Sequence, residues 1–82
     1  MTVSAAAIRT TLLTLVQQRS SGKTICPSEV ARALSTEHWR DLMPAVRAAG
    51  AELAGQGQIV VTQKGQVVDP QTAKGPIRYG QG

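Results

Sequence analysis

The first apolar residues of the chain recur at the spacing of one face of a helix. They are Ile8, Leu12, Leu15 and Val16, with Thr10, Thr14, Gln17 and Gln18 on the other side. Ser4 precedes this run, and its hydroxyl can accept a hydrogen bond from a free backbone N–H of the first turn. Ser20, Ser21 and Gly22 then interrupt the pattern, and glycine suits the left-handed turn after a helix. The pattern predicts a helix over residues 5–19.

A second, shorter helix is predicted to begin at Pro27. Proline lacks a backbone N–H but is tolerated in a first turn, where no intrahelical donor is needed, and Glu29 favours a helix N-terminus. Because a residue before proline is driven toward extended geometry, we expect Cys26 at the boundary, after a short extended stretch over residues 23–25. The apolar side of this helix consists of Val30, Ala31 and Leu34.

The third helical region, residues 37–54, contains Pro44. A proline inside a helix removes a hydrogen bond, so we expect a short turn through Trp39 and then a main helix capped by Asp41, with Pro44 in its first turn. Gly50 lies inside this helix, where glycine costs about 1 kcal/mol relative to alanine, and we expect it to permit close approach of the first helix. The inward residues are Leu42, Val46, Ala49 and Leu53.

Residues 58–63 are rich in β-branched side chains, which is typical of a strand. Lys64 and Gly65 form a tight-turn signal, and residues 66–69 are predicted to form the returning strand. Pro and Gly recur in the rest of the chain, so we expect an irregular segment there and a frayed tail over residues 80–82.

The order of these elements is the ground plan of a winged helix-turn-helix, an α+β fold with three helices and a C-terminal β-hairpin wing. The second and third helices form the helix-turn-helix. Eighty-two residues are too few for two independent cores, so we expect one domain over residues 4–79. Hydrophobic residues make up 41% of the chain, but Phe is absent, and Trp39 and Tyr79 are the only aromatic residues.

The core is therefore expected to be aliphatic. Its expected members are Leu12, Leu13, Leu15, Val16, Ile25, Val30, Leu34, Val46, Leu53, Ile59, Val60 and Val61. The single cysteine, Cys26, excludes an internal disulfide and is expected to be a small buried hydrophobe. The chain shows neither a secretory signal pattern nor an apolar run long enough to cross a membrane, so we expect a cytoplasmic protein.

Nine Lys and Arg residues against five Asp and Glu give a net charge of +4, which favours an anionic partner. In the predicted fold, the third helix and the wing can bring basic side chains together on phosphates. The residues predicted to bind nucleic acid are Arg40 and Arg47 on the third helix, Lys64 on the wing, and Lys74 and Arg78 in the tail. The arginines expected to be ordinary solvated charges are Arg9, Arg19 and Arg32.

The outward side of the third helix carries Ala45, Ala48, Ala51 and Glu52. Base edges are recognised by Arg, Asn, Gln or Lys, and Arg47 is the one such residue on this side. Two functions therefore stay open. The first is weak nucleic-acid binding, to DNA foremost, directed at the phosphate backbone, with specificity gained by dimerisation. The second is docking of a protein partner on the alanine-rich helix, and the positive wing favours the first by a small margin.

The chain offers few side chains that could act in catalysis. His38 and Asp41 are three residues apart, with Ser28 and Ser35 nearby, but these residue types also cap helix starts. A chain of this length has little room for a sheltered pocket, so we expect no enzyme activity, no cofactor and no metal site. Trp39 can stack on bases or anchor a partner, although in a core without Phe we expect it to pack between the second and third helices.

Five segments carry a resemblance to a known family. They are GKTICPSEVAR (22–32), WRDLMPAVRAA (39–49), IVVTQKG (59–65), VDP (68–70) and KGPIR (74–78). In these segments the chain resembles a small bacterial family of domains of unknown function that are considered winged-helix-like. The resemblance implies a winged-helix fold, and it assigns no catalytic or binding residues.

Overall fold

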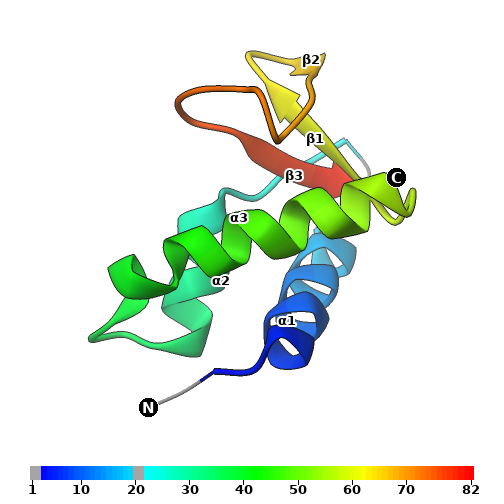
Figure 1. Ribbon diagram of the computed structural model, residues 1–82. Coiled ribbons are helices and arrows are strands. Elements are labelled where there is room, and N and C mark those ends of the chain that lie inside the picture. The colour runs from blue at the N-terminus through cyan, green and yellow to red at the C-terminus, as the bar shows by residue number, and fades with distance from the viewer. Residues whose placement is uncertain (1–2, 20–21) are drawn as a thin grey trace.

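A long helix divides the molecule, with a small sheet on one side and two helices on the other (Figure 1). The computed structural model describes residues 3–19 and 22–82. The helices are α1 (Ala5–Gln18), α2 (Pro27–Leu34) and α3 (Trp39–Gly55), and the strands are β1 (Ile59–Gln63), β2 (Gln66–Val67) and β3 (Arg78–Gln81). The strands form one antiparallel sheet in the order β2-β1-β3. The fold is α+β, as the sequence predicts.

The first two helices are confirmed, and their starts follow from local chemistry. The Ser4 hydroxyl accepts a hydrogen bond from the Ala7 backbone N–H at 3.1 Å, which caps α1. Cys26 is extended, and its N–H donates to the Glu29 carboxylate at 2.8 Å, so that α2 begins at Pro27. The predicted end of the first helix at Ser20 and Ser21 lies outside the described residues.

The start of α3 differs from the prediction. The helix begins at Trp39 with His38 before it, so Asp41 lies in the first turn and is not the cap. Pro44 lies inside the helix and leaves the Arg40 carbonyl without its usual donor. The helix continues through this position because packing outweighs the lost bond. Its residues Val46, Ala49, Gly50 and Leu53 are all buried.

The predicted hairpin is confirmed, but its returning strand spans only Gln66–Val67 and not residues 66–69. Thr62 pairs with Val67 and Gln63 with Gln66 across the β1–β2 turn. Lys64 and Gly65 form the turn with φ values of 53° and 81°, both positive as a type I′ turn requires.

The irregular, frayed tail predicted for the end of the chain is wrong for residues 78–81. These residues form β3, which pairs with the whole of the Ile59–Thr62 segment of β1. Tyr79 also exchanges two backbone hydrogen bonds with Ile25, of 2.8 and 2.7 Å. The partners of β3 are distant in sequence, and the segment Arg78–Gln81 has no apolar alternation of its own, so the local pattern did not indicate a strand.

The core lies between α3, the other helices and the inner face of the sheet. Its buried hydrophobic residues are Ile8, Leu12, Val16, Ile25, Val30, Ala31, Val46, Ala49, Leu53, Ile59, Val61, Ile77 and Tyr79. Ile77 and Tyr79 join the expected aliphatic residues, whereas Leu13, Leu15, Leu34 and Val60 are only partly buried. Within residues 3–19 and 22–82, no helix combines the length and apolar character needed to cross a bilayer.

Candidate nucleic-acid interface

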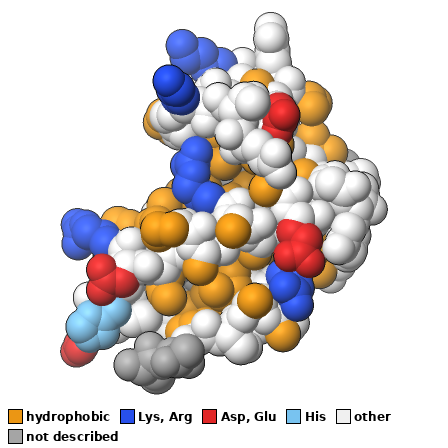
Figure 2. All heavy atoms as spheres, viewed as in Figure 1, with side chains coloured by type: hydrophobic (Ala, Val, Ile, Leu, Met, Phe, Trp, Pro, Cys, Tyr) orange, Lys and Arg blue, Asp and Glu red, His pale blue; other side chains and the backbone are white. Residues whose placement is uncertain are grey.

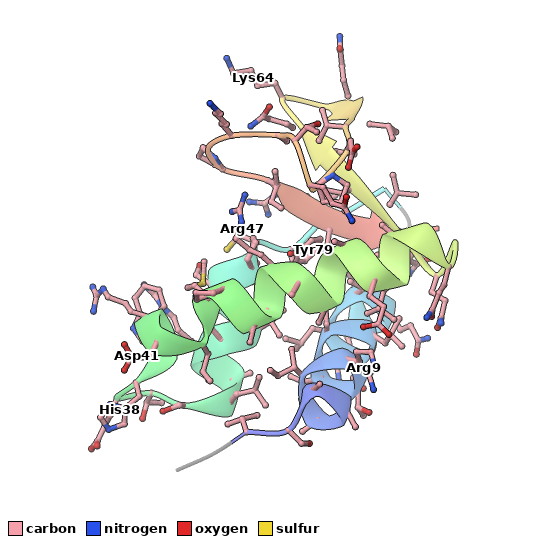
Figure 3. The ribbon with its side chains drawn as sticks, viewed as in Figure 1. Arg9, His38, Asp41, Arg47, Lys64 and Tyr79 are labelled. Atoms are coloured by element: carbon pink, nitrogen blue, oxygen red, sulfur yellow. The ribbon has the colours of Figure 1, made fainter. Side chains whose placement is uncertain are left out.

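Arg40 and Arg47 lie on the side of α3 that faces the β-turn. They are seven residues apart, which is two helical turns or about 10 Å along the axis. Figure 3 shows Arg47 pointing from α3 toward the loop that joins β2 to β3, with Lys64 at the tip of the hairpin beyond it. The Arg47 guanidinium approaches the Gly75 carbonyl oxygen at 3.4 Å, a long and weak contact. Arg47 is therefore held beside the loop with most of its donors free.

The loop after β2 brings Lys74 to the same side. The Gln63 side-chain amide donates to the Lys74 carbonyl at 2.6 Å and to the Pro76 carbonyl at 3.1 Å. These bonds fasten the loop to the end of β1, immediately before Lys64. Arg47 meets the same loop at Gly75, next to Lys74. The structure thus gathers three of the five predicted residues, Arg47, Lys64 and Lys74, and Arg40 continues the row along α3.

Ion pairing divides the basic residues into two groups. Arg9 pairs with Glu52 at 3.5 Å, and Arg19 pairs with Glu29. Within the described parts of the chain, no other Lys or Arg has a carboxylate within 4.0 Å. Figure 2 shows several blue side chains of Lys and Arg spaced down one edge of the molecule, and a further blue side chain beside a red one on the opposite side. The cations of α3, of the hairpin and of the loop after it are therefore all without an acidic partner among the described residues, as are Lys23, Arg32 and Arg78.

Arg78, the fifth predicted residue, lies apart from this group. Its guanidinium donates to the Thr24 hydroxyl at 2.6 Å and to the Thr24 carbonyl at 2.9 Å. These bonds tie β3 to the segment before α2, so the side chain already has a structural partner. Arg78 also lies near enough to Glu29 to lower the pKa of that carboxyl slightly.

Two groups have shifted pKa values, each for a clear reason. The N–H of Cys26 donates to the Glu29 carboxylate and holds the pKa of Glu29 below its ordinary value of 4.5, against an opposing effect of burial. Burial raises the pKa of Tyr79 to about 12, although the positive charge of Arg47 opposes the shift. Tyr79 is therefore neutral at physiological pH and belongs to the core.

Trp39 packs against the core and is only half-buried. The guanidinium carbons of Arg32 and Arg40 lie 4.3 and 4.4 Å from the centre of its ring, within the range of cation–π contacts. The expectation that Arg32 is an ordinary solvated charge is wrong in one respect, because its guanidinium lies over Trp39 although the residue is exposed. Arg32 lies on α2, and no local spacing relates it to a tryptophan on the next helix. The expected packing role of Trp39 holds for one part of its surface, while two arginines cover another.

The residues considered for catalysis make capping and turn contacts. The Ser35 hydroxyl accepts a hydrogen bond from the His38 backbone N–H at 3.0 Å, and the His38 Nδ1 lies 4.0 Å from an Asp41 carboxylate oxygen. Both of those side chains are well exposed, with 70% and 86% of their surface accessible. Ser28 lies 3.0 Å from the sulfur of Cys26, which is half-buried and not fully buried as expected.

The alanine-rich side of α3 is open to solvent. Ala45 and Ala48 are exposed, and they line a shallow hollow of about 280 Å³ with Ala5 of α1. The ion pair of Arg9 and Glu52 borders this hollow. This side of the helix offers methyl groups where base recognition needs hydrogen-bonding side chains.

Comparison with protein families gives one match. The model of a family described as "Protein of unknown function (DUF3253)" covers residues 5–82, from the start of α1 to the end of the chain. The chain belongs to the DUF3253 family. This membership agrees with the expected resemblance to a family of unknown function. No curated protein matches the chain.

Proposed function

We propose that this DUF3253 domain is a winged helix-turn-helix module that binds nucleic acid, DNA foremost, through the phosphate backbone and without catalysis. In this interpretation, α2 and α3 are the helix-turn-helix. Ile25, which bridges to β3, is the short first strand of the fold. The wing is the chain between the paired strands β1 and β3, residues 64–77, and it is longer than a simple hairpin.

The main support for this proposal is that the basic residues with a carboxylate partner lie in a different part of the fold from Arg40, Arg47, Lys64 and Lys74, which have none among the described residues. Arg9 and Arg19, at the two ends of α1, have carboxylate partners. The residues without such partners on α3 and the wing are Arg40, Arg47, Lys64 and Lys74. A winged helix presents its third helix and wing to the nucleic acid, so the free charges lie where phosphates would be met. Arg78 is left out because its Nε and Nη2 donate to Thr24, which ties the side chain to the segment before α2.

Backbone contacts are favoured over base reading by the composition of α3. Arg47 is half-buried and reaches toward the wing, and the exposed positions Ala45 and Ala48 offer no donor or acceptor. Phosphate contacts position a protein without reading sequence, so affinity is expected to vary little between unrelated duplexes.

A salt titration tests the proposal. Binding of a short fluorescent duplex, followed by anisotropy, should weaken linearly in log salt, with a slope of about −0.9 per phosphate contacted. The double variant Arg47→Ala, Lys64→Ala should flatten this slope by about two units, equally for unrelated sequences. Arg9→Ala is the control, because Arg9 lies on α1 away from the wing and is paired with Glu52 (Figure 3). Absence of binding to any duplex or single strand at low salt would refute the proposal.

Docking of a protein partner is the second candidate, supported by the exposed Ala45 and Ala48 and the hollow beside them. Ala48→Glu discriminates the two, since a bulky acid there should block close approach of a protein backbone. Under the nucleic-acid proposal the same change weakens DNA binding only modestly, because Ala48 is not one of the unpaired basic residues.

A further inference from the structure

Two guanidinium groups from different helices lie over one indole ring. Arg32 comes from the last turn of α2, and Arg40 follows Trp39 in the first turn of α3. Their guanidinium carbons are 4.3 and 4.4 Å from the ring centre. Both arginines are exposed, whereas Trp39 is half-buried against the core and so fixes the position of the cluster.

This arrangement holds two like charges close together. The two guanidinium carbons can be no farther apart than the sum of those two distances, which is close to the Debye length of about 8 Å at physiological ionic strength. Among the described residues, neither arginine has a carboxylate within 4.0 Å, and the nearby Asp41 lies instead beside His38. The indole attracts each cation, but no acid in the described chain compensates the repulsion between the two guanidinium groups. An anion that contacts both arginines would remove this repulsion.

We propose that the Arg32–Trp39–Arg40 cluster binds a phosphate group of the nucleic acid, as a second contact in line with Arg47. The inference rests on the proposed function. The arginine fork donates two parallel hydrogen bonds to a phosphate, and two such forks on one rigid ring are a stronger phosphate contact than a flexible lysine. Arg40 and Arg47 lie two turns apart on the same side of α3, so one sugar-phosphate backbone passing Arg47 reaches the cluster. The contact surface thereby extends from the wing across α3 to α2.

Charge removal at Arg32 tests the contact. Arg32→Gln should weaken binding of a short duplex roughly tenfold at low salt and flatten the log-salt slope by about 0.9, as expected for one lost phosphate. Arg9→Gln, which removes the same charge from α1, should leave both unchanged. Arg32→Lys separates charge from packing: it should keep most of the slope, since lysine retains the charge. Equal losses in Arg32→Gln and Arg32→Lys, together with a lower melting temperature, would assign Arg32 to packing of Trp39 and overturn the proposal.

Trp39 is the only tryptophan of the chain, so its fluorescence reports on this cluster directly. The positive charges should make iodide a strong quencher of Trp39, and Arg32→Gln should reduce quenching by iodide but not by neutral acrylamide. Saturating duplex should shield Trp39 from iodide in the wild-type protein. Suppose that the duplex binds, that Arg32→Gln does not change the salt slope, and that iodide still quenches Trp39 in the complex. The cluster is then not a contact, whereas the proposed function stands. If no duplex binds at all, both proposals fail.

Discussion

Gly50 and Tyr79 are in close contact in the core. An ideal Cβ at Gly50 would lie 2.5 Å from the Tyr79 hydroxyl oxygen, so the glycine exists to admit the tyrosine ring. The expectation that Gly50 admits α1 is therefore wrong. The Tyr79 hydroxyl has no hydrogen-bond partner within the described protein and is fully buried, which makes this site sensitive to any change of volume.

We predict that Gly50→Ala lowers the melting temperature. Alanine favours a helix by about 1 kcal/mol over glycine, but overpacking a close contact costs about 1–3 kcal/mol and should prevail. Gly55→Ala is the matched control, because a Cβ at Gly55, in the same helix, meets no atom within 4 Å. Thermal denaturation followed by circular dichroism measures both. A higher melting temperature for Gly50→Ala would show that the ring can move aside.

The turn between β1 and β2 combines a conformational cost with a charge that is proposed to contact phosphate. Lys64 has a φ of 53°, a left-handed conformation that costs an ordinary residue about 1–2 kcal/mol and that asparagine tolerates better. We therefore predict that Lys64→Asn raises the melting temperature and weakens duplex binding in the same protein. Parallel thermal denaturation and anisotropy titration check this, and stronger or unchanged binding would remove Lys64 from the interface.

The start of α2 depends on an ionised acid. The folded protein holds the pKa of Glu29 below 4.5, so ionised Glu29 stabilises the fold above that pH and loses this effect as pH falls through the lowered value. Glu29→Gln should lower the melting temperature at pH 7, and the difference from wild type should close as the pH is reduced below about 4.5. Glu37→Gln, in the α2–α3 connection, removes the same charge without removing a bond to the start of α2, and it should change the melting temperature less at pH 7. If the difference in melting temperature between Glu29→Gln and the wild type stays the same in acid, ionised Glu29 does not stabilise the start of α2.

Elements specified by local chemistry could be predicted from the sequence, and those specified by distant partners could not. Ser4 and Pro27 indicate the starts of α1 and α2, and Lys64–Gly65 indicates the β1–β2 turn. Each of these signals lies within a few residues of the element that it predicts. The start of α3 at Trp39 depends on packing that overrides Pro44, and β3 depends on β1 and Ile25. The same division applies to the site, because helix and turn positions indicated most of its basic residues, whereas the contact of Arg32 with Trp39 joins two helices.

The cations that are neutralised by an acid lie on α1 and at its end, whereas those on α3 and the wing have no carboxylate partner among the described residues. We predict that this asymmetry makes stability depend on salt. Raising the ionic strength from 0.01 to 0.15 M shortens the Debye length from about 30 to about 8 Å, which relieves repulsion among the free cations and should raise the melting temperature. The increase should be smaller in the Arg47→Ala, Lys64→Ala variant. Equal salt dependence in the two proteins, measured by differential scanning fluorimetry, would mean that these charges do not repel one another appreciably.

The pairing of Tyr79 with Ile25 also governs how the chain reaches this structure. The helices rely on short-range contacts that form within microseconds, but the core lacks its tyrosine until β3 closes a loop spanning more than half of the sequence. Closure of such a loop costs entropy before any contact compensates for it, so we expect the docking of β3 to be the slow step of folding. We therefore expect this three-helix protein to fold at the pace of its last strand.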